Sequence, residues 1–112
     1  MSDVGDNLKA SNANWKFGGE VAENFDEHVR KSVPFYNEGH QLICELSDYF
    51  IKPDSVCYEV GCSTGTLTRK LAEHNAAKPE ARFIGLDVEP DMIAAAERNS
   101  LDKGLNVEFV CN

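Results

Sequence analysis

Basic residues are scarce in this sequence of 112 residues: 11 Lys and Arg stand against 19 Asp and Glu, a formal net charge of −8 at pH 7. Because an acidic surface repels phosphate backbones, we expect no direct contact with nucleic acid. Apolar runs of membrane-spanning length are also absent, as is a basic segment followed by an apolar one at the N-terminus. From these absences we expect no membrane-spanning segment and no secretory signal.

Paired cysteines are a third absence: none of Cys44, Cys57, Cys62 and Cys111 belongs to a C-x-x-C motif. Cys57 and Cys111 lie in runs that read as buried strands, which predicts small apolar packing in a reducing compartment. We therefore expect a cytoplasmic protein. The three histidines have no metal-ligand spacing, so we expect no metal site and solvated imidazoles.

The N-terminal part is expected to contain a disordered segment and a helical cap. Residues 1–14 are polar and predict disorder, and order is expected to begin at Trp15. Within 15–53, apolar residues at helical spacing predict two amphipathic helices. The first ends near Pro34. The second has one apolar face, made of Leu42, Ile43, Leu46, Tyr49 and Phe50.

From residue 54 onward the pattern alternates between strands and helices. Residues 55–60, 82–86 and 106–111 are short runs of strand-forming residues, and we interpret the first as a buried parallel strand. Ser63 or Thr64 can cap the helix between the first two, and Pro90 opens the helix between the last two. The order β-α-β-α-β predicts an α/β fold, with 54–112 forming the N-terminal half of a Rossmann-like sheet.

Half of a doubly wound sheet leaves the strand 55–60 with one unpaired edge. We therefore expect a truncated chain, a fragment, or a protein completed by another chain. Self-association through this edge is a further expectation.

The turn after the first strand, E-V-G-C-S-T-G at 59–65, is the sharpest signal. Gly61 allows a positive φ and close approach of a ligand, and Gly65 lets the next helix start tight against the strand. A dinucleotide fingerprint would need glycine at Ser63 and Thr66, and a P-loop would need more residues between the glycines and a following Lys. A plain tight turn remains the alternative.

Two carboxylates strengthen the case for a binding site. Asp87 follows the second strand at about the distance from the glycine turn at which Rossmann-type sites place a ribose-binding acid. The alternative for Asp87 is a turn or helix-cap residue. Glu59 ends a strand expected to be buried, where an unpaired carboxylate is costly. It can receive a cationic group or order the glycine turn.

E-V-G-C-S-T-G resembles the first motif of class I S-adenosylmethionine-dependent methyltransferases, and L-D-V-E-P-D-M-I at 86–93 resembles their second. The resemblance implies that the first loop holds the methionine part of the cofactor, that Asp87 binds the ribose, and that Val88 lies beside the adenine. Met92 can reach the same pocket or face the core. The first-loop residues are Glu59, Gly61, Cys62, Ser63 and Gly65. For Cys62, a spacer role is preferred to that of a reactive thiol.

The segments V-A-E-N-F-D-E-H-V and K-S-V-P-F-Y, with Trp15-x-Phe17 before them, are similar to the start of carboxy-S-adenosylmethionine synthases. This similarity spans roughly 15–112 and implies a cofactor contact for Tyr36, whose alternative is a packing role. The chain departs from that group at Glu59, where Asp is usual, and at Val88, where a small polar residue is usual.

We therefore predict an S-adenosylmethionine-dependent methyltransferase acting on a small molecule, with its catalytic residues beyond Asn112. One alternative is a carboxy-S-adenosylmethionine synthase-like enzyme of tRNA wobble-uridine modification. A second is a non-catalytic cofactor-binding or interaction module. The glycine spacing disfavours a nucleotide-dependent dehydrogenase.

Overall fold

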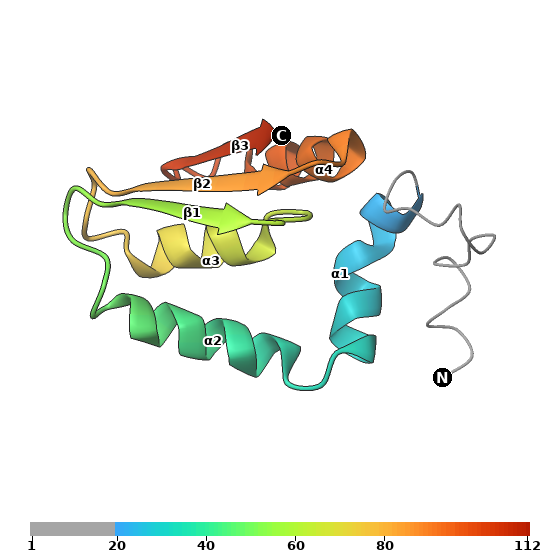
Figure 1. Cartoon of the computed structure of the whole chain (residues 1–112), viewed down its shortest axis with the longest axis horizontal. Helices are drawn as coiled ribbons and strands as arrows, with labels where there is room; N and C mark the ends of the chain where they lie inside the picture. The colour runs from blue at the N-terminus through green and yellow to red at the C-terminus, as the bar shows by residue number, and fades with distance from the viewer. Residues whose placement is uncertain (1–19) are drawn as a thin grey trace.

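The computed structural model describes residues 20–112 and forms an α/β fold (Figure 1). The segment 1–14 and the Trp15-x-Phe17 motif lie outside the described residues. The elements follow the order α1 (Glu20–Ser32), α2 (Tyr36–Ser47), β1 (Val56–Val60), α3 (Thr66–His74), β2 (Arg82–Asp87), α4 (Pro90–Ser100) and β3 (Val107–Cys111). The predicted order of two helices followed by β-α-β-α-β is confirmed.

The three strands form one parallel sheet in the order β1-β2-β3. In the register, Glu59 pairs with Gly85, which pairs with Phe109. All three strands therefore end at the same edge of the sheet, which faces α1 (Figure 1). This edge is where parallel α/β sheets place their ligands.

The main core lies between the sheet, α3 and α2. Cys44 of α2, Leu71 and Ala72 of α3, and Phe83 of β2 are buried together with Ala81. A smaller cluster joins α1 to α4 through Ala22 and Met92, with the Phe25 ring packed against them. The helical cap is thus held to the sheet domain by two separate apolar contacts.

The prediction that 55–60 is a buried strand is wrong. Exposure alternates along β1, and Val56, Tyr58 and Val60 are exposed, Val60 at 84%. The physical reason is that β1 lies at the edge of the sheet, and that no helix among residues 20–112 covers the face of β1 that carries these three side chains. Cys111, also expected to be buried, is exposed near the end of β3.

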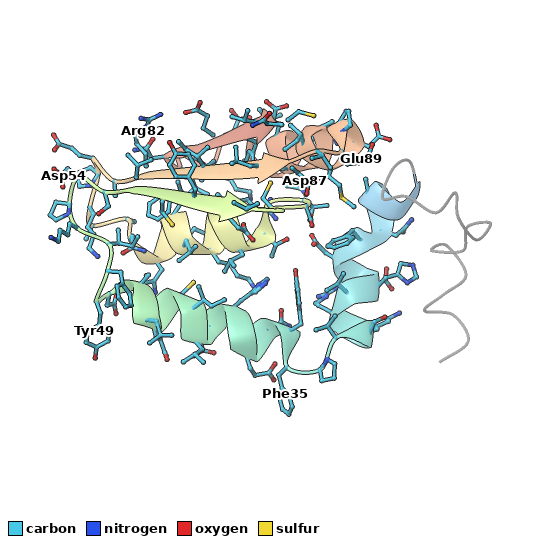
Figure 2. All side chains as sticks on the ribbon, viewed as in Figure 1. Phe35, Tyr49, Asp54, Arg82, Asp87 and Glu89 are labelled. Carbon is cyan, nitrogen blue, oxygen red and sulfur yellow. The ribbon has the colours of Figure 1, made fainter. Side chains whose placement is uncertain are left out.

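The predicted apolar face of the second helix is likewise exposed, and α2 ends at Ser47. Figure 2 shows Phe35 and Tyr49 pointing away from the body of the molecule. The helix instead buries Cys44 and Ser47, and the Ser47 hydroxyl accepts a hydrogen bond of 3.1 Å from the Asn75 side chain. Helix α2 therefore packs against α3 through its narrow face of small residues, Cys44 and Ser47.

Candidate functional site

The glycine turn is fastened to the end of β2 by backbone hydrogen bonds. The N–H groups of Gly61 and Cys62 both donate to the carbonyl of Leu86, at 2.8 Å each. Gly61 and Gly65 have φ of 77° and 80°, as the sequence predicts, and Ser63 adopts a left-handed φ of 55°. The cap predicted at Ser63 or Thr64 is wrong, because Gly65 occupies the N-cap of α3 without a side-chain bond.

Gly65 also lies where no side chain fits. A Cβ at this position would stand 2.7 Å from the Phe109 ring and 3.0 Å from the Ala96 Cβ. At Gly61, in contrast, a Cβ would meet nothing within 4 Å. The second glycine of the turn therefore serves close packing, and the first leaves open space beside the site.

Asp87 connects the glycine turn to the start of α4. Its carboxylate accepts one hydrogen bond from the Ser63 N–H and another from the Glu89 N–H, each of 2.9 Å. Two backbone donors fix the orientation of the carboxylate, and each oxygen keeps a second lone pair for another donor. Asp87 and Glu89 both lie at the edge of the sheet facing α1 (Figure 2).

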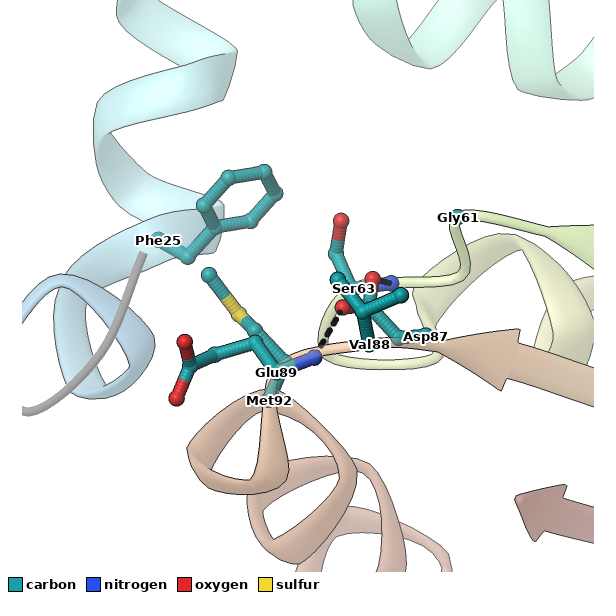
Figure 3. A pocket seen from close by; sticks show the side chains of 7 residues that line it. All are labelled: Phe25, Gly61, Ser63, Asp87, Val88, Glu89 and Met92. Carbon is teal, nitrogen blue, oxygen red and sulfur yellow. Dashed lines mark hydrogen bonds between the residues drawn. The ribbon is translucent and has the colours of Figure 1, made fainter. Parts of the chain in front are cut away.

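A cavity of about 340 Å³ opens between the glycine turn, the end of β2 and α1 (Figure 3). We call it the first cavity. It is lined by Phe25, Gly61, Ser63, Asp87, Val88, Glu89 and Met92. Met92 is only 1% exposed and lines the cavity, so the core and pocket interpretations of this residue hold together.

A second cavity, of about 150 Å³, adjoins the first and shares Phe25, Gly61 and Ser63 with it. It brings Tyr36 at the start of α2 together with Glu59 at the end of β1. Of the eight candidate residues, all except Gly65 therefore line one or both cavities.

Glu59 is a half-buried carboxylate that is hydrogen-bonded to α3. The Thr68 hydroxyl donates to it at 2.5 Å, and burial raises the pKa of Glu59 above its ordinary value of 4.5. A cationic group in the second cavity would stabilise the ionised form. Burial also raises the pKa of Tyr36, and Asp26 adds to that shift.

Cys62 has the properties of a spacer. It is 4% exposed, and burial raises its thiol pKa to about 12. Its side chain lies over Gly85, where a Cβ would stand 2.9 Å from the sulfur. A thiol with so little thiolate at neutral pH is a poor nucleophile.

Two of the three histidines differ from the sequence prediction of solvated rings, whereas His74 is exposed as predicted. His28 is buried at 6% exposure, and its Nδ1 has no hydrogen-bond partner among the described residues. His40 lines the second cavity, with its ring centroid 4.2 Å from that of Tyr36 and its Nδ1 3.0 Å from Lys70 Nζ. Burial and Lys70 lower the pKa of His40.

Sequence reasoning also missed the contribution of α1. Phe25 lines both cavities, and Asp26 accepts hydrogen bonds from two threonine hydroxyls of the glycine turn and α3. The run D-E-H at 26–28 resembles an ordinary helix surface, so only the tertiary contact reveals it. Within residues 20–112, no group of three His, Cys, Asp or Glu residues could hold a metal ion. The same range contains no helix long and apolar enough to cross a membrane.

Comparison with known proteins adds a family match. Residues 58–112 match the sequence model of a family described as a methyltransferase domain. The chain is 39% identical over 74 residues to a carboxy-S-adenosyl-L-methionine synthase of Staphylococcus epidermidis, covering 65% of this chain and 32% of that protein. It is 32% identical over 101 residues to the protein of the same name from Helicobacter hepaticus, covering 87% and 41%.

The fold is also similar to that of a solved methyltransferase. Coclaurine N-methyltransferase bound to N-methylheliamine and SAH superposes with a TM-score of 0.54 at 18% identity, covering 95% of this chain and 25% of that one. The chain thus spans about a third to two fifths of the length of the curated relatives described above.

Proposed function

We propose that this chain binds S-adenosylmethionine in its two cavities as part of a methyltransferase acting on a small molecule, since residues 58–112 match the sequence model of a methyltransferase domain family. The observation that carries the proposal is the position of Asp87. Its carboxylate is held by the N–H groups of Ser63 and Glu89 at the mouth of an apolar cavity. An oriented acceptor beside an apolar wall suits a nucleoside, whose ribose donates hydrogen bonds and whose base needs apolar contact.

The first cavity is the proposed nucleoside subsite. The ribose hydroxyls donate to Asp87, and the adenine lies among Val88, Met92 and Phe25. The exposure of Val88 in the free chain fits this role, because a ligand would cover an apolar side chain that the fold leaves in solvent.

The second cavity is the proposed subsite for the amino-acid end. The Glu59 carboxylate accepts hydrogen bonds from the ammonium group. The ion pair formed in this way compensates for the cost of an ionised carboxylate in a partly desolvated place. The Thr68 hydroxyl already orients the carboxylate, so binding needs little rearrangement. When bound, the cofactor supplies an electrophilic methyl group, and the residues of this chain hold and orient it.

Calorimetric titration tests the proposal with S-adenosylmethionine, S-adenosylhomocysteine and NAD. We expect both adenosyl ligands to bind and Asp87→Asn to weaken them by about tenfold or more, since an amide cannot accept as strongly as a carboxylate. Asp54→Asn is the control, because it removes the same charge at the opposite end of the sheet (Figure 2). Binding of NAD alone, or equal effects of the two variants, would refute the proposal.

A second candidate is carboxy-S-adenosylmethionine synthesis in tRNA wobble-uridine modification, favoured by the named relatives and by Tyr36 in the second cavity. Mass spectrometry of the ligand that copurifies with the chain distinguishes the methyltransferase from the carboxy-S-adenosylmethionine synthase. A carboxymethyl group on the sulfonium supports this second candidate, and a methyl group supports the first. Binding without turnover of either kind supports a non-catalytic module.

We also propose that copies of the chain associate through β1, in a cytoplasmic setting. One edge of β1 has no partner among residues 20–112, and the face with Tyr58 and Val60 is exposed. The four free cysteines fit a reducing compartment. Sedimentation equilibrium should show association that weakens in Tyr58→Lys. A monomer at high concentration would refute the association.

A further inference from the structure

Helix α1 is joined to the glycine turn by a hydrogen-bond network that spans about forty residues of sequence. Asp26 Oδ1 accepts from the Thr64 hydroxyl at 2.7 Å and from the Thr66 hydroxyl at 2.9 Å. We call these contacts, with those of Arg69 below, the Asp26 network. Thr64 is buried inside the turn itself, and Thr66 is the first residue of α3.

Arg69 completes the network from the other side. One of its guanidinium nitrogens donates to the Thr64 carbonyl at 2.7 Å, and the other donates to the Thr66 hydroxyl at 3.3 Å. The Thr66 hydroxyl therefore accepts a hydrogen bond from the Arg69 cation and donates one to the Asp26 anion, and the two bonds polarise each other in the same direction. The turn is held between two opposite charges from two different helices.

The network lies beside the proposed cofactor site. Phe25, the neighbour of Asp26 in sequence, lines both cavities, and Thr64 and Thr66 line the second. The same part of α1 also packs Ala22 and Phe25 against Met92. Loss of the network would therefore remove the polar contacts that hold the wall carrying Phe25 against the glycine turn.

We propose that Asp26 is a positioning residue that docks α1 on the glycine turn and couples the order of α1 to cofactor binding. This inference rests on the proposed function, because the coupled ligand is the adenosyl cofactor. Asp26 acts through the turn and through Phe25. By linkage, a ligand that orders the turn also orders α1, and a docked α1 binds the ligand more tightly.

The test combines calorimetry with hydrogen exchange of the amides in 24–32, using S-adenosylhomocysteine as the probe. Asp26→Ala removes both hydroxyl contacts. Glu27→Ala is the matched control, since Glu27 is an exposed carboxylate on the same turn that pairs with Lys31 at 2.9 Å. Asp26→Asn is the rescue variant, because its amide oxygen can still accept from both hydroxyls.

We expect Asp26→Ala to bind about tenfold more weakly, the size of one charge-assisted contact, and to lose ligand-induced protection of 24–32. Glu27→Ala should keep both properties, and Asp26→Asn should fall between the two. A merely structural role would lower the thermal midpoint and leave the ligand-induced protection intact. That outcome, or unchanged affinity in Asp26→Ala, would overturn the proposal.

If Asp26→Ala does not fold, Thr66→Val removes the hydroxyl that contacts both Asp26 and Arg69, and it carries the same expectation. Failure of the proposed function is separately visible. If the wild-type chain does not bind the probe but Asp26→Ala accelerates exchange in 24–32, the docking role stands and the assignment of the ligand falls. If exchange in 24–32 is also unchanged, the docking role falls.

Discussion

Substitution of the two glycines of the turn should separate stability from binding. Both have positive φ, of 77° and 80°, so alanine at either position is strained by about 1–2 kcal/mol. Only Gly65 is also crowded, since its Cβ would stand 2.7 Å from the Phe109 ring. Overpacking of this kind adds about 1–3 kcal/mol. We expect Gly65→Ala to destabilise the fold by about 2–5 kcal/mol in total, and Gly61→Ala by about 1–2 kcal/mol.

Urea unfolding followed by circular dichroism measures the difference. With an m-value of about 1–3 kcal/mol per molar, Gly65→Ala should lower the midpoint by on the order of 1–2 M relative to Gly61→Ala. Set against a domain stability of about 5–15 kcal/mol, that loss is a large share. Gly61→Ala should instead weaken binding of S-adenosylhomocysteine, because Gly61 lines both cavities.

A double variant tests the stated cause. Phe109→Leu removes the ring atoms that a Cβ at position 65 would meet, so Gly65→Ala in that background should cost about 1–2 kcal/mol less than in the wild type. The strain from φ remains in both backgrounds. Equal destabilisation by Gly61→Ala and Gly65→Ala, or additive effects of Gly65→Ala and Phe109→Leu, would refute the packing argument.

Three further predictions concern the second cavity and the thiols. Thr68→Val leaves the half-buried Glu59 carboxylate without its hydroxyl donor and should destabilise the chain by about 1–3 kcal/mol in urea unfolding. Thr68→Ser should restore most of this stability, and equal losses in the two variants would contradict the role of the hydroxyl. The raised pKa of Glu59 means that the folded chain holds a proton above pH 4.5 that an ammonium ligand displaces. Affinity for S-adenosylhomocysteine should therefore rise with pH just above that value. Calorimetry in two buffers of different ionisation enthalpy should detect the proton released on binding, and Glu59→Gln should release none. Iodoacetamide should alkylate the exposed Cys111 first and leave Cys62 unmodified in the native chain, because the Cys62 pKa of about 12 and its burial suppress the thiolate; early modification of Cys62, located by peptide mass spectrometry, would contradict this.

The order of the elements and the glycine turn could be predicted because their signals are local. Strand-forming runs bounded by Pro and Gly indicate the three strands, and parallel strands place their ends at one edge. The positive φ of Gly61 and Gly65 follows from a property of glycine alone. Asp87 could be placed beside the turn because it ends the strand that pairs with β1.

Burial could not be read from the pattern in two places. The apolar residues of β1 and α2 suggest burial, yet Val60 and Leu46 are exposed, because exposure depends on which neighbours pack there. The sequence by itself therefore determined the topology and the carboxylates and glycines at the ends of the strands. Only the tertiary structure decided that α1 joins the glycine turn through Asp26 and lines the cavities through Phe25, because these contacts join segments about forty residues apart, and residue spacing carries no record of such contacts.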